Sequence, residues 1–162
     1  MSNLKAIDLF AGAGGFSLGF ALAGVDVVAA VEYHKPATKT YAYNFPGYLV
    51  DHRDIQKLEP REVEIDLNQR DIGREEIDLV IGGPPCPGFS HIGRSKIISL
   101  IRDGTWGGEE TRHRFVQDPR NQLFLRFVAY VDHFQPRGFV MENVTGMKTS
   151  VNKDGISIPT LI

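Results

Sequence analysis

The stretch Leu4-Lys5-Ala6-Ile7-Asp8-Leu9-Phe10-Ala11-Gly12-Ala13-Gly14-Gly15 decides the fold of this chain. Residues 4–10 are predicted to form a strand that is apolar on both faces, as a central strand of a parallel sheet is. The glycines then lead into residues 16–24, which are predicted to form a helix. One face of that helix carries three apolar residues: Leu18, Ala21 and Leu22. A glycine turn between a strand and a helix presents backbone N–H groups to a ligand.

An acid after the next predicted strand strengthens the case for a ligand site. The spacing Gly12-x-Gly14-Gly15 is a weak signal by itself, because it lacks the full G-x-G-x-x-G of dinucleotide sites and also fits a tight connection. Residues 25–31 form a second apolar run, which Glu32 follows about 20 residues after the turn. In Rossmann-like sites an acid at this distance binds the ribose hydroxyl pair. The alternative is a solvated carboxylate at a strand end.

Strands and helices are predicted to alternate along the rest of the chain. Short apolar runs predict three more strands, at residues 48–50, 77–81 and 138–141. Further helices are predicted at residues 36–44 and 119–135, the second one opened by Asp118 and Pro119 and ended by Pro136. This order predicts an α/β fold, a mostly parallel, doubly wound sheet with helices on both faces.

Two more acids are expected at the same edge of this sheet. Asp54 follows the third strand and Glu142 follows the last one. Because parallel strands share one C-terminal edge, these carboxyl groups should converge with the glycine turn on one crevice. The other acids of residues 51–78 are predicted to form a solvated helix face and loop.

The only cysteine of the chain, Cys86, lies in the stretch Gly82-Gly83-Pro84-Pro85-Cys86-Pro87-Gly88-Phe89-Ser90. This stretch follows the strand at residues 77–81, and its glycines and prolines stop regular structure. A lone cysteine is more often an inert buried residue than a reactive one. A loop framed by glycine and proline is a costly place for an inert residue, so we predict a functional thiol at a strand tip.

Composition limits the class of protein. The chain has 162 residues, enough for one domain, with 42% hydrophobic residues and a net charge of -2. Any binding of nucleic acid must therefore come from a local patch. One cysteine excludes an internal disulfide and a Cys-rich zinc site, which is typical of a reducing compartment. The start of the chain lacks a signal-peptide pattern and no apolar run reaches membrane-spanning length, so we expect a cytoplasmic protein, or a nuclear one if eukaryotic.

Taken together, four motifs resemble those of the cytosine-5 DNA methyltransferase family. Residues 8–16 resemble its S-adenosylmethionine loop, residues 83–90 its nucleophile loop and residues 142–144 its catalytic acid motif. Residues 118–124 resemble the helix between the last two. The motifs occur in family order with family-like spacing, which makes the resemblance far more specific than any one of them. Pro87 departs from the glutamine that many members carry after the nucleophile, but the thiol is kept.

The resemblance implies a role for each matching residue. Cys86 and Glu142 would be catalytic. The S-adenosylmethionine pocket would consist of Asp8, Phe10, Ala11, Gly12, Gly14, Gly15, Phe16, Glu32, Tyr33, Asp54, Ile55, Gly83, Pro84, Asn121 and Leu123. The substrate cytosine would meet Pro85, Phe89, Ser90, Asn143 and Val144. Residues 91–117 would form the loop that closes over a flipped base, and no metal is expected.

The resemblance also implies partners and a missing part. It implies the Rossmann-like fold of S-adenosylmethionine-dependent methyltransferases, incomplete at its C-terminal end. Residues 1–162 would be the N-terminal portion of the catalytic domain, without the target-recognition domain and the C-terminal segment. We therefore expect a truncated or split enzyme that is inactive alone, with double-stranded DNA and a second chain as partners. Such a protein would be associated with the nucleoid of a bacterium or archaeon.

The chemistry implied is methyl transfer to C5 of a flipped cytosine through a covalent adduct with Cys86, with S-adenosylhomocysteine as product. Three alternatives stay open at this point. One is a cofactor-binding module without activity, and another is the same chemistry on structured RNA. A nicotinamide dehydrogenase is the third, but it would leave Cys86 and Glu142 without a role.

Overall fold

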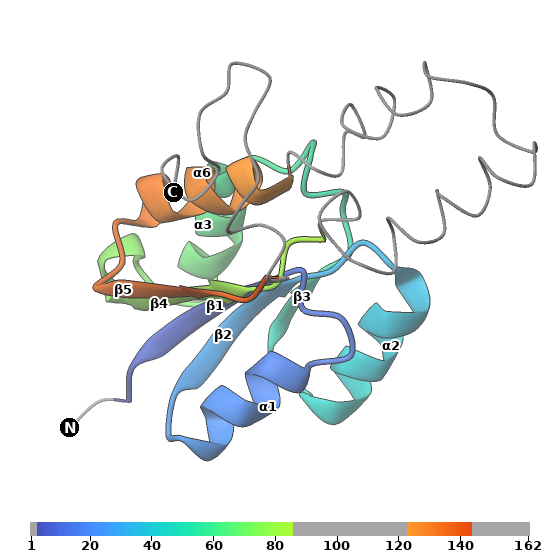
Figure 1. Ribbon diagram of the computed structural model, residues 1–162. Coiled ribbons are helices and arrows are strands. Elements are labelled where there is room, and N and C mark those ends of the chain that lie inside the picture. The colour runs from blue at the N-terminus through green and yellow to red at the C-terminus, as the bar shows by residue number, and fades with distance from the viewer. Residues whose placement is uncertain (1–2, 86–122, 144–162) are drawn as a thin grey trace, which may run out of the picture. The chain divides into compact units, whose positions relative to one another are not determined.

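The computed structural model describes residues 3–85 and 123–143, and all structural statements below concern these residues (Figure 1). The chain divides into two compact units. The first comprises Met1–Pro84 and Leu125–Glu142, and the second comprises Pro85–Phe124 and Asn143–Ile162. Since the second unit lies almost entirely outside the described residues, the fold below is that of the first.

A five-stranded parallel sheet forms the centre of this unit. Its strands are β1 (Lys5–Leu9), β2 (Asp26–Val31), β3 (Leu49–Asp51), β4 (Ile77–Gly82) and β5 (Gly138–Met141). The strand order is β3-β2-β1-β4-β5, and every neighbouring pair is parallel. The strand expected to be central is therefore central, because β1 pairs with β2 on one side and β4 on the other. Ala6, Ile7 and Leu9 of β1 are fully buried.

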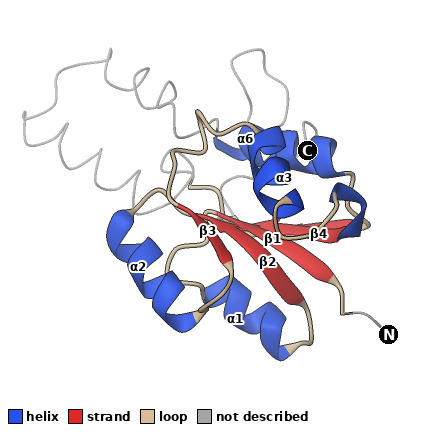
Figure 2. Cartoon of the chain, turned by 180° about the vertical axis from the view of Figure 1, so that it is seen from behind, coloured by secondary structure: helices blue, strands red, loops and turns tan. Residues whose placement is uncertain are grey.

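Helices cover both faces of the sheet, as predicted (Figures 1 and 2). One face carries α1 (Gly15–Leu22) and α2 (Lys35–Asn44), and the other carries α3 (Pro60–Asn68) and α6 (Leu123–Phe134). A short 3₁₀ helix, η1 (Arg74–Glu76), precedes β4. None of the described helices is long and apolar enough to cross a membrane.

Helix α3 lies in the acidic stretch that was predicted to be mostly a solvated helix face and loop. Pro60 opens the helix, and the backbone N–H of Glu59 donates to the Glu62 carboxylate at 2.9 Å in a capping box. Val63 and Leu67 of this helix are buried. The acids of α3 stay partly exposed, as a solvated face requires. Asp51 of the same acidic stretch departs from the prediction, because it is buried at the end of β3 and paired with Arg53.

Aromatic rings of α6 form the core on that face. Phe127, Tyr130 and Phe134 are buried, and the Phe127 ring meets the Phe139 ring of β5 edge-on with centroids 6.1 Å apart. Burying one such side chain stabilises a fold by about 1.5–3 kcal/mol. This aromatic stripe therefore accounts for much of the attachment of α6 to the sheet.

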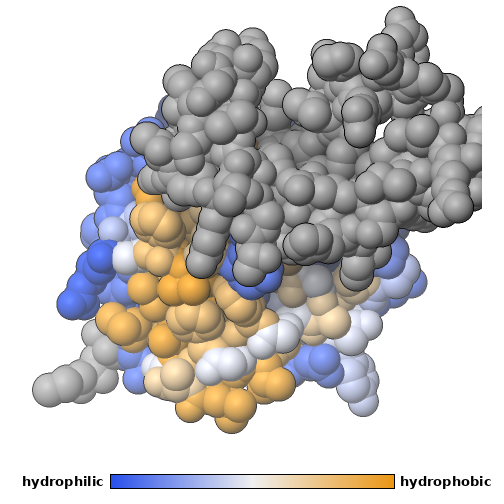
Figure 3. Space-filling model, viewed as in Figure 1, coloured by the Kyte–Doolittle hydropathy of each residue, from blue (hydrophilic) through white to orange (hydrophobic). Residues whose placement is uncertain are grey.

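The apolar face predicted for α1 does not face the sheet. Leu18 and Leu22 are 52% and 82% exposed, whereas Ser17 is fully buried. The predicted helix is present, but its one buried side chain is that of Ser17, while Phe16, Phe20 and Ala21 are half-buried. Figure 3 shows apolar side chains gathered on the side of the molecule that carries α1. The exposed apolar residues also include Phe139 and Val140 of the edge strand β5.

Candidate cofactor and catalytic site

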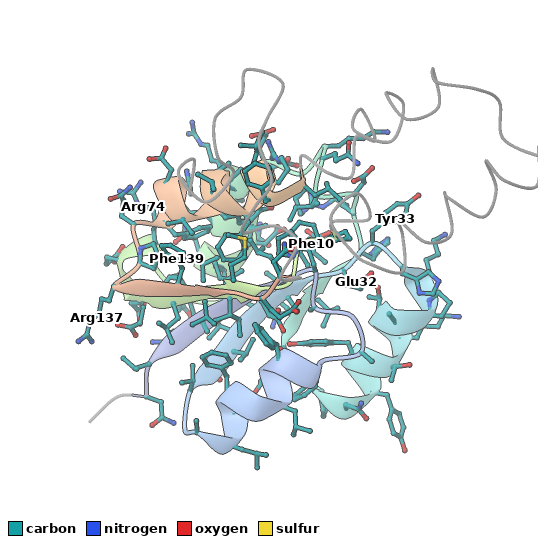
Figure 4. All side chains as sticks on the ribbon, in the orientation of Figure 1. Phe10, Glu32, Tyr33, Arg74, Arg137 and Phe139 are labelled. Carbon is teal, nitrogen blue, oxygen red and sulfur yellow. The ribbon has the colours of Figure 1, made fainter. Side chains whose placement is uncertain are left out.

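The candidate site lies where the parallel strands end. The chain leaves β1 toward β2 on one side, while β4 lies on the other side of β1, so the sheet has its topological switch point between β1 and β4. Ligands of open α/β sheets bind in the crevice outside the strand ends at such a point. Phe10, Glu32 and Tyr33 lie toward this end of the sheet (Figure 4). Arg74 and Arg137 mark the opposite end (Figure 4).

The glycine turn after β1 has an unusual backbone. Phe10, Gly12 and Gly14 have φ angles of 60°, 57° and 96°. A positive φ in a bulky residue such as Phe10 costs about 1–3 kcal/mol and is typical of functional sites. At Gly14 a Cβ would collide with the Phe45 ring and come within 3.0 Å of the Tyr41 ring. Only glycine therefore fits at Gly14, because α2 packs directly against the turn.

Glu32 braces this turn from the tip of β2. One carboxylate oxygen accepts a hydrogen bond from the Gly12 N–H at 2.8 Å, and the other accepts one from the His34 N–H at 2.6 Å. The turn is also tied to β2 by the Ala11 N–H, which donates to the Val31 carbonyl at 3.1 Å. Each carboxylate oxygen can accept a second bond. Glu32 can therefore hold the turn and still receive the ribose hydroxyls that the sequence predicts.

Asp8 lies within β1 and is completely buried. Its Oδ2 accepts a hydrogen bond from the Ser17 hydroxyl at 2.6 Å, and the same hydroxyl lies 2.6 Å from the Tyr41 hydroxyl. Burial raises the pKa of Asp8 to about 6, against the lowering effect of the bonds from Ser17. Among the described residues, Asp8 Oδ1 is the one buried side-chain nitrogen or oxygen without a hydrogen-bond partner. Contact of Asp8 with a cofactor stays a prediction.

This Asp8–Ser17–Tyr41 chain has a clear donor order. Because the single Ser17 proton is given to Asp8, the Tyr41 hydroxyl donates to Ser17. The chain joins β1, α1 and α2 through three fully buried side chains. Sequence reasoning missed this role of Ser17 and Tyr41, and the only available signal was a hydroxyl on each of two predicted helices.

The turn after β3 carries Asp54 and Ile55. The Lys57 and Leu58 N–H groups donate to the Asp54 carbonyl at 2.8 and 3.0 Å, and the Gln56 N–H donates to the Asp54 carboxylate at 3.0 Å. The Asp54 side chain is half-buried and Ile55 is buried. Asp54 thus lies at the predicted edge, in a turn closed by its own backbone and side chain.

The tips of β4 and β5 meet at the other side of the switch point. The Glu142 N–H donates to the Gly82 carbonyl at 2.9 Å. A Cβ built on Gly83 would lie 3.1 Å from Glu142 Oε2, so the carboxylate of Glu142 lies over Gly83. A Cβ on Gly82 would collide with the Leu9 carbonyl oxygen of β1. Glycines at both positions therefore let β1, β4 and the predicted catalytic acid come together.

The remaining predicted residues divide into those outside the described part of the chain and those whose burial the structure gives. Cys86, Phe89, Ser90, Asn121, Val144 and the loop expected at residues 91–117 lie outside the described residues. Gly15 and Phe16 begin α1, and Tyr33 is exposed after Glu32. Pro84 is buried and Pro85 is exposed, while Leu123 begins α6 and is buried and Asn143 is half-buried. In the described part of the chain, no group of three or more His, Cys, Asp or Glu side chains could hold a metal ion.

Comparison with known proteins identifies the class and then the family. Solved structures that resemble this chain include methyltransferases. One is described as a DNA modification methyltransferase encoded within an Escherichia coli prophage, with a TM-score of 0.69 and 34% identity over 98% of this chain and 36% of that one. Another is a mutant of Spodoptera frugiperda DNMT2, with a TM-score of 0.57 and 27% identity over 93% of this chain and 38% of that one. The family model for C-5 cytosine-specific DNA methylase matches residues 4–158. The chain belongs to this family.

Two relatives show how much of a family member the chain covers. The type II methyltransferase M.DdeI of Desulfomicrobium norvegicum is 39% identical over 150 residues, which are 93% of this chain and 30% of the relative. The type II methyltransferase M1.HphI of Haemophilus parahaemolyticus is 41% identical over 147 residues, 91% of this chain and 34% of the relative. The chain thus spans about a third of the length of these relatives.

Proposed function

We propose that this chain supplies the S-adenosylmethionine pocket and the catalytic pair of a DNA cytosine-5 methyltransferase. The observation that carries the proposal is the meeting of three strand tips at the switch point. The strained glycine turn lies after β1, and the Glu142 carboxylate lies over Gly83, three positions before Cys86 in the chain. Family membership and type II methyltransferase relatives support a role in DNA methylation and restriction-modification.

The pocket residues present match the cofactor expected. Three features form a cradle for an amino acid joined to a ribose. The backbone is strained at Phe10, a ligand can approach Gly12 because a Cβ there would meet nothing within 4 Å, and the Glu32 carboxylate is held by the Gly12 N–H. Asp54 and Ile55 would bind the adenine from the tip of β3. When bound, S-adenosylmethionine would supply an activated methyl group next to the cytosine.

Residues of this chain would form and break the covalent bond to the substrate cytosine. The Cys86 thiolate adds to C6 of a flipped cytosine, which breaks the aromaticity of the ring and makes C5 nucleophilic. Glu142, at N3, stabilises the charge that develops on the ring. Bound S-adenosylmethionine would supply the methyl group that C5 takes up, with its methyl–sulfur bond broken and S-adenosylhomocysteine as the product. A base then takes the C5 proton, and the C6–S bond breaks to restore the ring and the thiolate.

Two measurements test this function. Calorimetry of the 162-residue chain with S-adenosylhomocysteine should detect one binding site per chain. When the chain is joined to the part of a relative that it does not cover, a duplex that carries 5-fluorocytosine should form a covalent adduct in the presence of S-adenosylmethionine, and Cys86→Ser should abolish the adduct but keep the binding. An adduct formed by Cys86→Ser would show that another residue is the nucleophile, and lack of binding would refute the pocket.

A second function is favoured by the length comparison. Because the chain covers only 30% and 34% of the two relatives, it could act as the cofactor-binding half of an enzyme completed by a second chain. Cofactor binding without an adduct would select this alternative. Methyl transfer to tRNA but not to duplex DNA would instead select an RNA substrate.

A further inference from the structure

Helix α6 carries a polar stripe that faces the turn after β3. Arg126, Tyr130 and His133 have the spacing of one helix face. Each bonds to the segment between β3 and the middle of α3. The Tyr130 hydroxyl donates to the Leu58 carbonyl at 3.3 Å, and the His133 Nε2 lies 2.7 Å from Glu64 Oε2.

Arg126 makes the most specific of these contacts. Its Nε donates to the Ile55 carbonyl at 3.0 Å and its terminal nitrogen to the Leu58 carbonyl at 2.7 Å. Both residues that offer these carbonyls are buried, so the carbonyl oxygens need a protein partner. A planar guanidinium presents its donors in a rigid fork that fixes the positions of two acceptors, whereas the donors of a lysine ammonium rotate freely. One side chain thus fixes both ends of the segment Ile55–Leu58.

That segment is continuous with Asp54. The Asp54 carbonyl closes the turn by accepting from Lys57 and Leu58, and its carboxylate accepts from Gln56. Strand β3, which ends at Asp51, holds only one side of this turn. On its other side, the turn is held through the Ile55 and Leu58 carbonyls, to which Arg126 donates, and Tyr130 adds a second bond at Leu58.

We propose that Arg126 is a positioning residue for the adenine end of the cofactor pocket. It acts through Asp54 and Ile55, which it holds at the sheet edge by their turn, and it does not touch the ligand. This inference rests on the proposed function, because that function makes Asp54 and Ile55 the adenine contacts. It predicts that the loss of Arg126 impairs recognition of the adenine more than it impairs the pocket as a whole.

The test compares Arg126→Met with two matched variants. Arg70→Met removes another arginine that donates to a backbone carbonyl, that of Gly47 before β3, at 2.8 Å. Glu59→Gln removes the carboxylate that pairs with Arg126 at 3.3 Å but leaves both carbonyl bonds. Binding is measured by calorimetry with S-adenosylhomocysteine and with S-inosylhomocysteine, in which a carbonyl replaces the adenine amino group. Amide hydrogen exchange is measured at Gln56–Leu58 without ligand.

Arg126→Met should speed exchange at these amides and weaken binding of S-adenosylhomocysteine by about tenfold. Binding of S-inosylhomocysteine should change much less, so the preference for adenine should fall. Arg70→Met and Glu59→Gln should keep that preference. The inference is overturned if Arg126→Met leaves exchange at Gln56–Leu58 unchanged, or if it weakens both ligands equally, as a purely structural role would.

The result for the unmodified chain separates the two proposals. If it binds S-adenosylhomocysteine and Arg126→Met binds it with the same preference, the inference fails and the proposed function stands. If the unmodified chain does not bind S-adenosylhomocysteine at all, the proposed pocket fails, and the role of Arg126 in adenine recognition fails with it.

Discussion

Replacing Asp8 by asparagine should remove a pH-dependent part of the stability of this chain. The Asp8 side chain is fully buried, and burial raises its pKa from 3.8 to about 6. The folded state therefore holds the proton to a higher pH than the unfolded state does. Its contribution to stability is complete below pH 3.8, decreases as the pH rises and is lost above about pH 6.

The size of this effect follows from the two pKa values. The interval from 3.8 to about 6 corresponds to about 3 kcal/mol, because one pKa unit is about 1.4 kcal/mol. An asparagine side chain in place of Asp8 could still accept the bond from the Ser17 hydroxyl, but it cannot ionise. Its amide would leave an unpaired N–H where Asp8 Oδ1 has no partner, which costs about 1–3 kcal/mol at every pH. The pH dependence, and not the stability at one pH, is therefore the informative quantity.

Urea denaturation followed by circular dichroism from about pH 4 to about pH 7 measures this quantity. The free energy of unfolding of Asp8→Asn, minus that of the unmodified chain, should rise by about 2.4 kcal/mol over this range. Taking the difference cancels the titration of the other acids. Asp71→Asn, at an exposed residue, is the control for the loss of one carboxylate. A flat Asp8 difference, or one that falls with pH, would refute the reasoning.

Two further substitutions test the backbone of the site. Gly82→Ala should cost more than about 3 kcal/mol in urea denaturation, because its Cβ would collide with the Leu9 carbonyl, whereas Gly19→Ala, whose Cβ meets nothing within 4 Å, should be neutral or stabilising. A Gly82→Ala chain as stable as Gly19→Ala would contradict this geometry. Phe10→Gly should be more stable to heat than Phe10→Ala by about 1 kcal/mol, since only glycine relieves the positive φ of 60°. Equal melting temperatures would show that the backbone at Phe10 is not strained.

The sheet was predictable because its strands are short apolar runs that are buried on both faces. The runs at residues 77–81 and 138–141 correspond to β4 and β5 almost residue for residue. Helix α1 was harder to predict. Periodicity placed Leu18, Ala21 and Leu22 on one apolar face, but Leu18 and Leu22 are exposed. The helix is held instead by Ser17, whose partners Asp8 and Tyr41 lie on other elements. A polar residue buried by pairing leaves no periodic signal.

The edge that carries the candidate site was predictable from one rule, since every parallel strand ends there. Applied to the sequence alone, this rule places Glu32, Asp54 and Glu142 at one edge. The contacts that orient them were not predictable, because they join distant parts of the chain. The bond from Arg126 to the Ile55 carbonyl spans 71 positions, and the need for glycine at Gly82 arises from the Leu9 carbonyl of another strand.

The central place of β1 also affects how a newly made chain acquires its structure. β1 is synthesised first, and its partner β2 follows soon after, but its second partner begins only at Ile77. Long-range pairings of this kind form slowly, and an unpaired edge of an apolar strand is prone to aggregate meanwhile. During translation the turn at Gly12 and its brace Glu32 leave the ribosome well before β5 does. A nascent chain stalled before Gly138 would therefore possess the cradle and lack the strand that carries Glu142 to it.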